Sequence, residues 1–263
     1  AEQNMMGTAA GLAAAGKIPF CSTFAVFATG RAFDQIRQSI AYPRLNVKIA
    51  ASHAGITVGE DGSSHQSVED LALMRVLPNM TVFVPADAIE VAGAVRAAVA
   101  IDGPVYIRLG RAPVPVIHGS DFVFRPGEAV VLRPGQDVTV IATGIMVAAA
   151  LEAAESLSAE GVTVRVLNVH TLKPLDVETV VRAAAETGAV VTAEEHSIIG
   201  GLGSAIAEVL GECHPVPMKR VGIQDTFGES GKPGELLEKY GLTPAAIAAA
   251  VREVLRRKEK KRL

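Results

Sequence analysis

Short apolar runs alternate with amphipathic segments along almost the whole chain, and this alternation most constrains the fold. Apolar runs of only four to six residues suit strands that are buried on both faces, as in a parallel sheet covered by helices. The expected strands are 18–22, 47–51, 81–84, 105–109, 138–142, 163–167, 189–192 and 216–221. The expected helices are 5–15, 29–41, 67–77, 87–101, 146–158, 176–186, 202–210, 235–240 and 243–256. The pattern predicts a doubly wound α/β fold with mostly parallel sheets.

The alternation is interrupted near the middle of the chain by a segment rich in Pro and Gly. This composition, between about residues 112 and 134, is typical of a linker and allows a hairpin-like piece within it. We therefore expect two doubly wound domains, 1–115 and 136–263, joined by a linker at 116–135. The first domain opens on a helical stretch with no strand before it. We expect it to be N-terminally incomplete, because such a sheet would otherwise expose an apolar edge.

The charge balance gives no reason to expect nucleic acid or a membrane as a partner. The formal net charge is −3, and the one basic run, 256–262, is more typical of a solvated chain end than of a binding patch. No apolar run reaches the roughly 18 residues that a membrane helix needs, and no signal-peptide pattern opens the sequence. Cys21 and Cys213 form no CxxC pair and suit a reducing compartment, so we expect a cytoplasmic protein.

The loop 52–66 carries most of the polar groups that are able to do chemistry. It joins an expected strand to an expected helix and so lies at the carboxyl end of the strand, where open α/β sheets bind ligands. His53 and His65 lack the spacing of a zinc site and suit proton transfer or hydrogen bonding to substrate hydroxyls. A surface turn explains any one of these residues equally well. The whole set, with Asp61 among it, favours a functional site.

Two other groups of residues have a structural explanation beside a functional one. Phe24 and Phe27 follow an expected strand, where a flat ring could stack while the Glu2 carboxylate bonds a ring nitrogen. Ordinary core packing and a solvated terminus explain these three residues at least as well. Arg108 and Arg111 end the strand 105–109, and their guanidinium groups suit phosphate, carboxylate or a surface ion pair.

The second half of the chain offers weaker signals. The glycine-rich stretch 200–203 is more typical of a tight helix entry than of a phosphate site. The run Glu194-Glu195-His196 has no metal-ligand spacing, and the remaining His residues are scattered, so we expect them to be structural.

With these residues placed, the chain resembles the C-terminal half of a transketolase nearly end to end. The resemblance rests on five stretches: AEQNM at 1–5, CSTFAVF at 21–27, the loop 52–66, YIRLGR at 106–111 and EEHSIIGGLG at 194–203. It implies the pyrimidine-binding domain of a thiamine diphosphate enzyme, followed by the C-terminal α/β domain of that family.

The resemblance implies how the cofactor and the substrate would be held. Glu2 would bond N1′ of the aminopyrimidine and favour the imino form that takes the proton from thiazolium C2, and Phe24 and Phe27 would hold the ring. His53 and His65 would contact the C1 hydroxyl and the carbonyl oxygen of a ketose. The remaining expected substrate ligands are Asp61, for a hydroxyl, Arg111, for the sugar phosphate, and Arg108.

The resemblance also implies a partner chain. The family binds the diphosphate and Mg²⁺ through a GDG…N type of motif in a separate domain. No such motif occurs here. The stretch GEDG at 59–62 is similar in composition, but it belongs to the pyrimidine-side loop. We therefore expect half of a split enzyme, with no metal ligand of its own, a diphosphate-binding partner subunit and a homodimer of this chain. It would move a two-carbon ketol unit from a ketose phosphate to an aldose phosphate.

Alternatives to this interpretation remain open. A 1-deoxyxylulose-5-phosphate synthase shares the domain order and the Glu, but its pattern usually lacks a His at position 53. Pyruvate dehydrogenase β subunits are more distant. A non-catalytic α/β interaction module is the alternative from another class, since a fold does not imply a function. Against it stands the joint occurrence of five residues: Glu2, His53, Asp61, His65 and Arg111.

Overall fold

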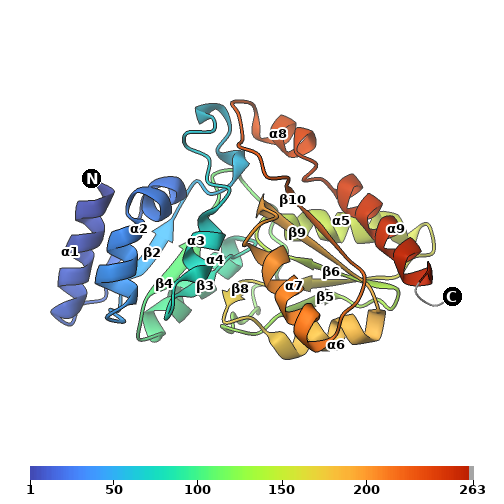
Figure 1. Cartoon of the computed structure of the whole chain (residues 1–263), viewed down its shortest axis with the longest axis horizontal. Helices are drawn as coiled ribbons and strands as arrows, with labels where there is room; N and C mark the ends of the chain where they lie inside the picture. The colour runs from blue at the N-terminus through green and yellow to red at the C-terminus, as the bar shows by residue number, and fades with distance from the viewer. Residues whose placement is uncertain (261–263) are drawn as a thin grey trace.

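The structure, a computed structural model, describes residues 1–260 as two α/β units that lie side by side (Figure 1). Each unit contains a five-stranded sheet. The N-terminal unit is drawn in blue to green and the C-terminal unit in yellow to red (Figure 1). None of the described helices combines the length and the apolar character required to cross a membrane.

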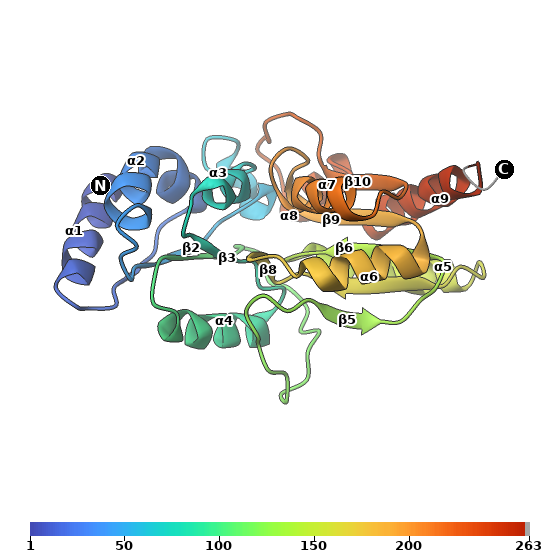
Figure 2. The same ribbon diagram turned by 60° about the horizontal axis from the view of Figure 1, so that its bottom comes forward.

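The first sheet is parallel except for one edge strand. Its strands, in spatial order, are β1 (Phe20–Cys21), β2 (Lys48–Ala51), β4 (Val105–Arg108), β3 (Thr81–Phe83) and β8 (Thr171–Lys173). Helices α3 (Asp70–Val76) and α4 (Ala88–Ala100) lie on opposite faces of this sheet, as Figure 2 shows, and α1 (Glu2–Ala14) lies at its outer end. All four residues of β4 are buried, because both faces of this central strand are covered.

The second sheet has the same design. Its strands, in spatial order, are β10 (Met218–Ile223), β9 (Val190–Ser197), β6 (Val138–Ala142), β7 (Val164–Asn168) and β5 (Val130–Arg133), of which β5 alone is antiparallel to its neighbour. The helices of this unit are α5 (Met146–Ser158), α6 (Val177–Thr187), α7 (Leu202–Cys213), α8 (Pro233–Lys239) and α9 (Pro244–Lys260). Helix α5 packs beside α9, and α6 packs beside α7.

The predicted α/β class with two mostly parallel sheets is confirmed. The segment expected as one helix at 29–41 instead forms two π-helical segments, η1 (Phe27–Arg31) and η2 (Ile36–Ala41), around the short helix α2 (Phe33–Gln35). A π-helical turn holds an additional residue, so apolar spacing alone cannot distinguish it from an α-helix. The linker forms no hairpin but supplies the single strand β5, which pairs with β7.

Strand β8 was not predicted, and it crosses the expected domain boundary. It comes from the C-terminal half of the chain but pairs antiparallel with β3 in the first sheet. Three residues are too few for an alternating pattern to be recognised. The two units therefore share a sheet edge as well as a linker.

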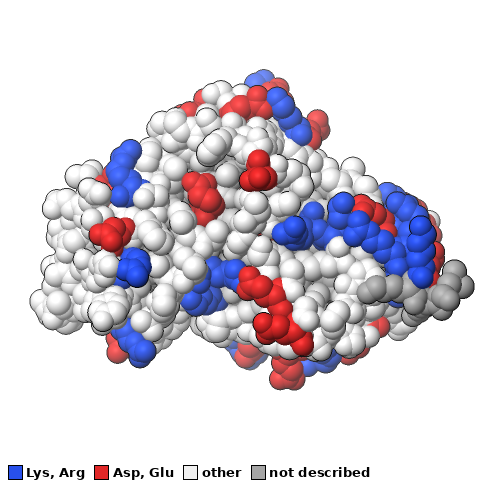
Figure 3. All heavy atoms as spheres, in the orientation of Figure 1, with Lys and Arg blue, Asp and Glu red and all other residues white. Residues whose placement is uncertain are grey.

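Charged side chains are unevenly distributed on the surface. On the face drawn in Figure 3, the N-terminal unit shows few of them, whereas Lys and Arg gather over β10 and α9. Three of these cations, Lys219, Arg220 and Arg256, line a shallow groove between the two elements.

Candidate functional site

The loop 52–66 leaves the carboxyl end of β2 and adopts an unusual backbone. His53 has a φ of 58°, and Gly55 and Gly59 have φ values of 81° and 84°. Side chains other than Gly rarely adopt this conformation, and where they do, the surrounding contacts must compensate for the strain. The loop continues into a short 3₁₀-helical turn, η3 (Ile56–Asp61). The loop is therefore built around several residues with a positive φ, most of which are Gly.

Two histidines of this loop meet two phenylalanines from the segment after β1. The Phe24 and His53 rings are stacked, with centroids 3.8 Å apart and planes 9° apart. The His65 and Phe27 rings are roughly perpendicular, with centroids 5.3 Å apart, and the two Phe rings are nearly parallel, with centroids 5.9 Å apart. All four side chains are partly exposed. The four residues predicted separately from the sequence thus form one contiguous aromatic cluster.

Glu2, the first residue of α1, is connected to this cluster through Arg31. The Arg31 Nη1 donates a hydrogen bond to Glu2 Oε2 at 3.0 Å, and its guanidinium carbon lies 4.4 Å from the centroid of the Phe27 ring. A backbone N–H at the helix start and the Arg31 guanidinium lower the pKa of Glu2, which is therefore a carboxylate at neutral pH.

The contacts of the Arg31 guanidinium indicate whether Glu2 and Phe27 could hold an aminopyrimidine ring. The Arg31 guanidinium is a flat, N–H-donating group that lies over Phe27 and bonds the Glu2 carboxylate at the same time. An aminopyrimidine ring offers the same two features, a flat π-face and N–H donors. The pair of Glu2 and Phe27 therefore fits such a ring. One face of Phe24, by contrast, is already covered by His53.

Arg111 lies at the exposed end of the same loop. Its Nη1 is 3.7 Å from Asp61 Oδ2 and 3.9 Å from Glu60 Oε2, and it donates a short hydrogen bond to the Val58 carbonyl. The Arg111 side chain remains 42% exposed, so it is free to exchange these carboxylates for another anion. Partial burial, and then the positive charge of Arg111, lower the pKa of His53, so its ring is neutral at pH 7.

We name the residues that meet in this region the open cluster. They come from α1, from the segment after β1, from the loop 52–66 and from the segment after β4. Its members are Glu2, Phe24, Phe27, His53, Asp61, His65 and Arg111.

Arg108 does not belong to the open cluster, although it ends the same strand as expected. Its guanidinium is buried and makes two hydrogen bonds to the Asp70 carboxylate, at 2.8 and 3.1 Å, and a third to the Glu195 carbonyl. Burial alone would raise the pKa of Asp70, but the Arg108 charge more than offsets this and lowers it. This placement argues against a substrate-binding role for Arg108, and we leave it out of the proposed site.

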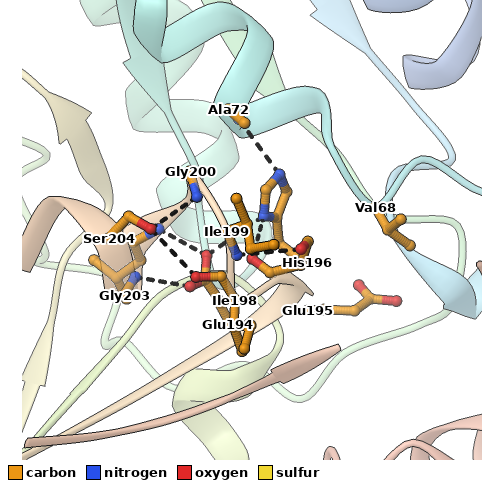
Figure 4. Close-up of polar contacts among 12 residues, drawn as sticks. Val68, Ala72, Glu194, Glu195, His196, Ile198, Ile199, Gly200, Gly203 and Ser204 are labelled. Carbon is orange, nitrogen blue, oxygen red and sulfur yellow. Dashed lines mark hydrogen bonds and ion pairs between the residues drawn. The ribbon is translucent and has the colours of Figure 1, made fainter. Parts of the chain in front are cut away.

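The glycine-rich stretch at 200–203 forms a helix entry, as expected. The Glu194 carboxylate accepts hydrogen bonds from the Leu202 and Gly203 amides, both at 2.7 Å, at the start of α7 (Figure 4). Since these amides already bind an anion of the chain itself, they are not available to a phosphate.

We name a second group of residues the buried junction, because all of its members are buried where the two units meet. Its members are Asp70, Tyr106, Arg108, Glu194, Glu195 and His196. Tyr106 donates to Asp70 at 2.7 Å, and His196 accepts from the Ala72 amide at 3.4 Å (Figure 4). In residues 1–260, no group of three or more His, Cys, Asp or Glu side chains is arranged to hold a metal ion.

Comparisons with known proteins agree with this architecture. Residues 1–116 match the family model described as the pyrimidine binding domain of transketolase, and residues 127–247 match that of the transketolase C-terminal domain. The chain is 54% identical to a 6-deoxy-6-sulfo-D-fructose transketolase subunit from Clostridium sp. (strain MSTE9), over 98% of the chain and 80% of the relative. It is 39% identical to one of the subunits of an apulose-4-phosphate transketolase from Phocaeicola vulgatus, over 98% of the chain and 82% of the relative.

A solved structure has the same fold and a similar sequence. It is described as a split gene transketolase in an inactive β4 tetramer. The TM-score is 0.93 and the identity 61%, and the match covers 97% of this chain and 82% of that one.

Proposed function

The chain belongs to the transketolase family, and on this basis we propose that it supplies the pyrimidine side of a thiamine diphosphate-dependent active site. In this interpretation it is one subunit of a split enzyme. The assembled enzyme moves a two-carbon ketol unit from a ketose phosphate to an aldose phosphate, as in the pentose phosphate pathway.

One observation carries this proposal: residues from four separate segments converge in the open cluster. A carboxylate, two aromatic rings, two imidazoles and a guanidinium lie in one partly exposed region. A chain that used the fold only for interaction would have no need to gather these groups around a strained His53.

The open cluster divides into a cofactor part and a substrate part. Thiamine diphosphate, when bound, supplies the electron sink that cleavage of a ketose carbon–carbon bond requires. Glu2 would accept an N–H hydrogen bond from the aminopyrimidine, and the faces of Phe27 and Phe24 would fix the plane of the ring. The low pKa of Glu2 keeps it in the accepting, ionised form.

The substrate part contains both histidines. His53, neutral at pH 7, can accept a proton from a sugar hydroxyl or donate a hydrogen bond to it. We assign a hydrogen-bonding role toward the sugar to His65 as well, whose ring lies 5.3 Å from that of Phe27. Asp61 would accept a hydrogen bond from another hydroxyl. Arg111 would bind the terminal phosphate, for which its planar fork is suited.

The remainder of the site is proposed to come from a partner chain. The diphosphate and Mg²⁺ would be bound by a separate diphosphate-binding subunit, and two copies of the present chain would occur in the assembly. Cys21 and Cys213 are both free thiols, which suits the reducing cytoplasm, where we place this reaction.

The experiment that tests the proposal is a reconstitution. Ketol transfer from xylulose 5-phosphate to ribose 5-phosphate is measured with thiamine diphosphate and Mg²⁺, first with this chain alone and then with the diphosphate-binding subunit. We expect turnover only in the mixture. Turnover by the chain alone would contradict the split site, and an inactive mixture would contradict the assigned reaction.

The same assay with a second ketose donor shows whether the site prefers a phosphate or a sulfonate group at the end of the sugar. The relatives act, by their names, on a sulfonated ketose in one case and a phosphorylated one in another. A 6-sulfo ketose should therefore be compared with xylulose 5-phosphate at equal concentration. A guanidinium such as Arg111 binds either anion, so the ratio of the two kcat/KM values decides which one this chain prefers.

A further inference from the structure

Glu194 and Glu195 are neighbouring buried carboxylates that serve different parts of the molecule. Successive side chains of a strand point to opposite faces, so on β9 these two diverge. Figure 4 shows Glu194 directed toward the start of α7 and the Glu195 carboxylate directed away from it. Glu194 therefore caps a helix of its own unit, whereas Glu195 reaches across to the N-terminal unit.

The Glu195 carboxylate bonds the loop that carries the two histidines. Its Oε1 accepts a hydrogen bond from the Thr57 amide at 2.7 Å, within η3. Gly55 lies against the same carboxylate, so close that a Cβ at this position would be 2.2 Å from Glu195 Cδ. A side chain at position 55 would therefore displace Glu195. The loop is shaped to receive this one carboxylate.

Glu195 is itself fixed in place from the other side. Its backbone carbonyl accepts a hydrogen bond from Arg108 Nη2 at 2.8 Å, and Arg108 is held by Asp70. Both carboxylates and the guanidinium are buried, so water does not compete for these bonds. Rigid contacts thus run from β4 and α3, through β9, to Thr57.

A second contact holds the far end of the loop to the same unit. The Gln66 amide donates hydrogen bonds to the carbonyls of Ile56 and Gly59 within the loop, and to that of Glu229 in the C-terminal unit. Thr57 and Gln66 thus attach the loop to the C-terminal unit after His53 and again after His65. Neither contact touches the open cluster itself.

We propose that Glu195 is a positioning residue, which acts through the Thr57 amide to hold His53 and His65 in the geometry needed for ketol transfer. The C-terminal unit thereby contributes to the reaction without supplying a group to the open cluster. This inference rests on the proposed function of the open cluster.

The first test uses the chain alone and needs no activity. Amide hydrogen exchange is measured at Thr57, and ring NMR signals are recorded for His53 and His65. Glu195→Ala should speed exchange at Thr57 by about 10- to 100-fold, as expected for a lost buried bond to a carboxylate, and should shift both ring signals. Glu195→Gln keeps an acceptor oxygen and should restore most of the protection. Unchanged exchange and ring signals in Glu195→Ala would overturn the proposal.

The second test measures the kinetics of the assembled enzyme, per folded molecule. Displacement of the histidines should lower kcat/KM by about 10- to 100-fold in Glu195→Ala, and by less than about threefold in Glu195→Gln. Glu194→Gln is the matched control, since it changes an equally buried neighbour that faces α7, and it should leave kcat/KM unchanged. An equal loss in Glu194→Gln and Glu195→Ala would show a general structural effect and contradict the proposal. An inactive wild-type assembly would contradict the proposed function instead, while the exchange measurement would still decide the role of Glu195.

Discussion

The open cluster and the buried junction lie on either side of one loop and both contain Asp, Glu, His and Arg side chains, yet they differ in burial. In the junction, Asp70 and Arg108 are 0% and 7% exposed and bind each other with good geometry. In the open cluster, the Asp61 and Arg111 side chains are 43% and 42% exposed, and the distance from Arg111 Nη1 to Asp61 Oδ2 is 3.7 Å, too long for a hydrogen bond. The same Asp–Arg pairing is therefore a structural element in one place and an exchangeable contact in the other.

This difference shows which polar groups are available for chemistry. A buried, fully bonded group cannot bind a substrate without breaking the contacts that hold the two units together. An exposed group with weak contacts can exchange them for a ligand at little cost. Substitutions in the two regions should consequently separate activity from stability.

The largest effect is expected from Glu2→Gln. The amide still has an acceptor oxygen, but it carries no charge and cannot exchange a proton with the aminopyrimidine, so kcat of the reconstituted enzyme should fall by about 100- to 10,000-fold. The free energy of unfolding should barely change, because the ion pair with Arg31 lies at the surface. The matched control is Glu178→Gln, a carboxylate in the first turn of α6 that pairs with Arg182. Retained turnover in Glu2→Gln would exclude Glu2 from catalysis.

Asp70→Ala should have the largest effect on stability. It leaves the buried Arg108 charge unpaired and the Tyr106 hydroxyl without its acceptor, which should cost about 3–5 kcal/mol of the free energy of unfolding. Urea denaturation measures this loss. Asp61→Ala, its counterpart in the open cluster, should cost no more than about 1 kcal/mol. Similar losses in the two variants would remove the distinction between the two regions.

His170 should make stability depend on pH. Its ring is buried beside Phe124, and this burial, followed by the nearby His118, lowers its pKa to about 4, against an ordinary value of 6.5. As the pH falls from 6.5 to 4, the unfolded chain gains a proton that the folded chain does not take up, so stability falls by about 3 kcal/mol. His170→Phe should lack this part of the pH dependence in denaturation curves. An identical pH dependence in the variant would contradict the assignment.

Arg111→Ala should have the smallest effect of the four. Loss of the charged hydrogen bonds to the sugar phosphate should raise KM for the donor by about tenfold and leave kcat nearly unchanged. Arg125→Ala, which removes another exposed Arg paired with a Glu, should leave both constants unchanged. If kcat fell and KM did not, Arg111 would act on the reacting atoms and not on the phosphate.

The sequence predicted the fold and the open cluster better than the buried junction. The strands at 47–51 and 138–142 were recognisable because short, mostly apolar runs that alternate with amphipathic segments are typical of strands buried in a parallel sheet. The open cluster was recognisable because its polar residues follow strand ends. Arg108 was grouped with Arg111 because both follow one strand end. Only the fold reveals that Arg108 points inward to Asp70.

Features that depend on long-range contacts were not predictable. Strand β8 is three residues long and pairs with a strand almost ninety positions earlier, so no local pattern announces it. The sequence assigns Glu195 no role beyond the absence of metal-ligand spacing in the run Glu194-Glu195-His196, because nothing in it places this residue beside Thr57. The Gly at position 55 leaves room for the Glu195 carboxylate, but the sequence alone does not reveal which group lies against this glycine.

The most direct test of the half-site is a titration calorimetry experiment with thiamine diphosphate and Mg²⁺. The cofactor is added to this chain alone, to the diphosphate-binding subunit alone and to the mixture. We expect the tightest binding in the mixture, weaker binding in a mixture that contains Glu2→Gln, and little or none to this chain alone. Binding to this chain alone as tight as to the mixture would contradict the claim that the open cluster is one half of a shared site.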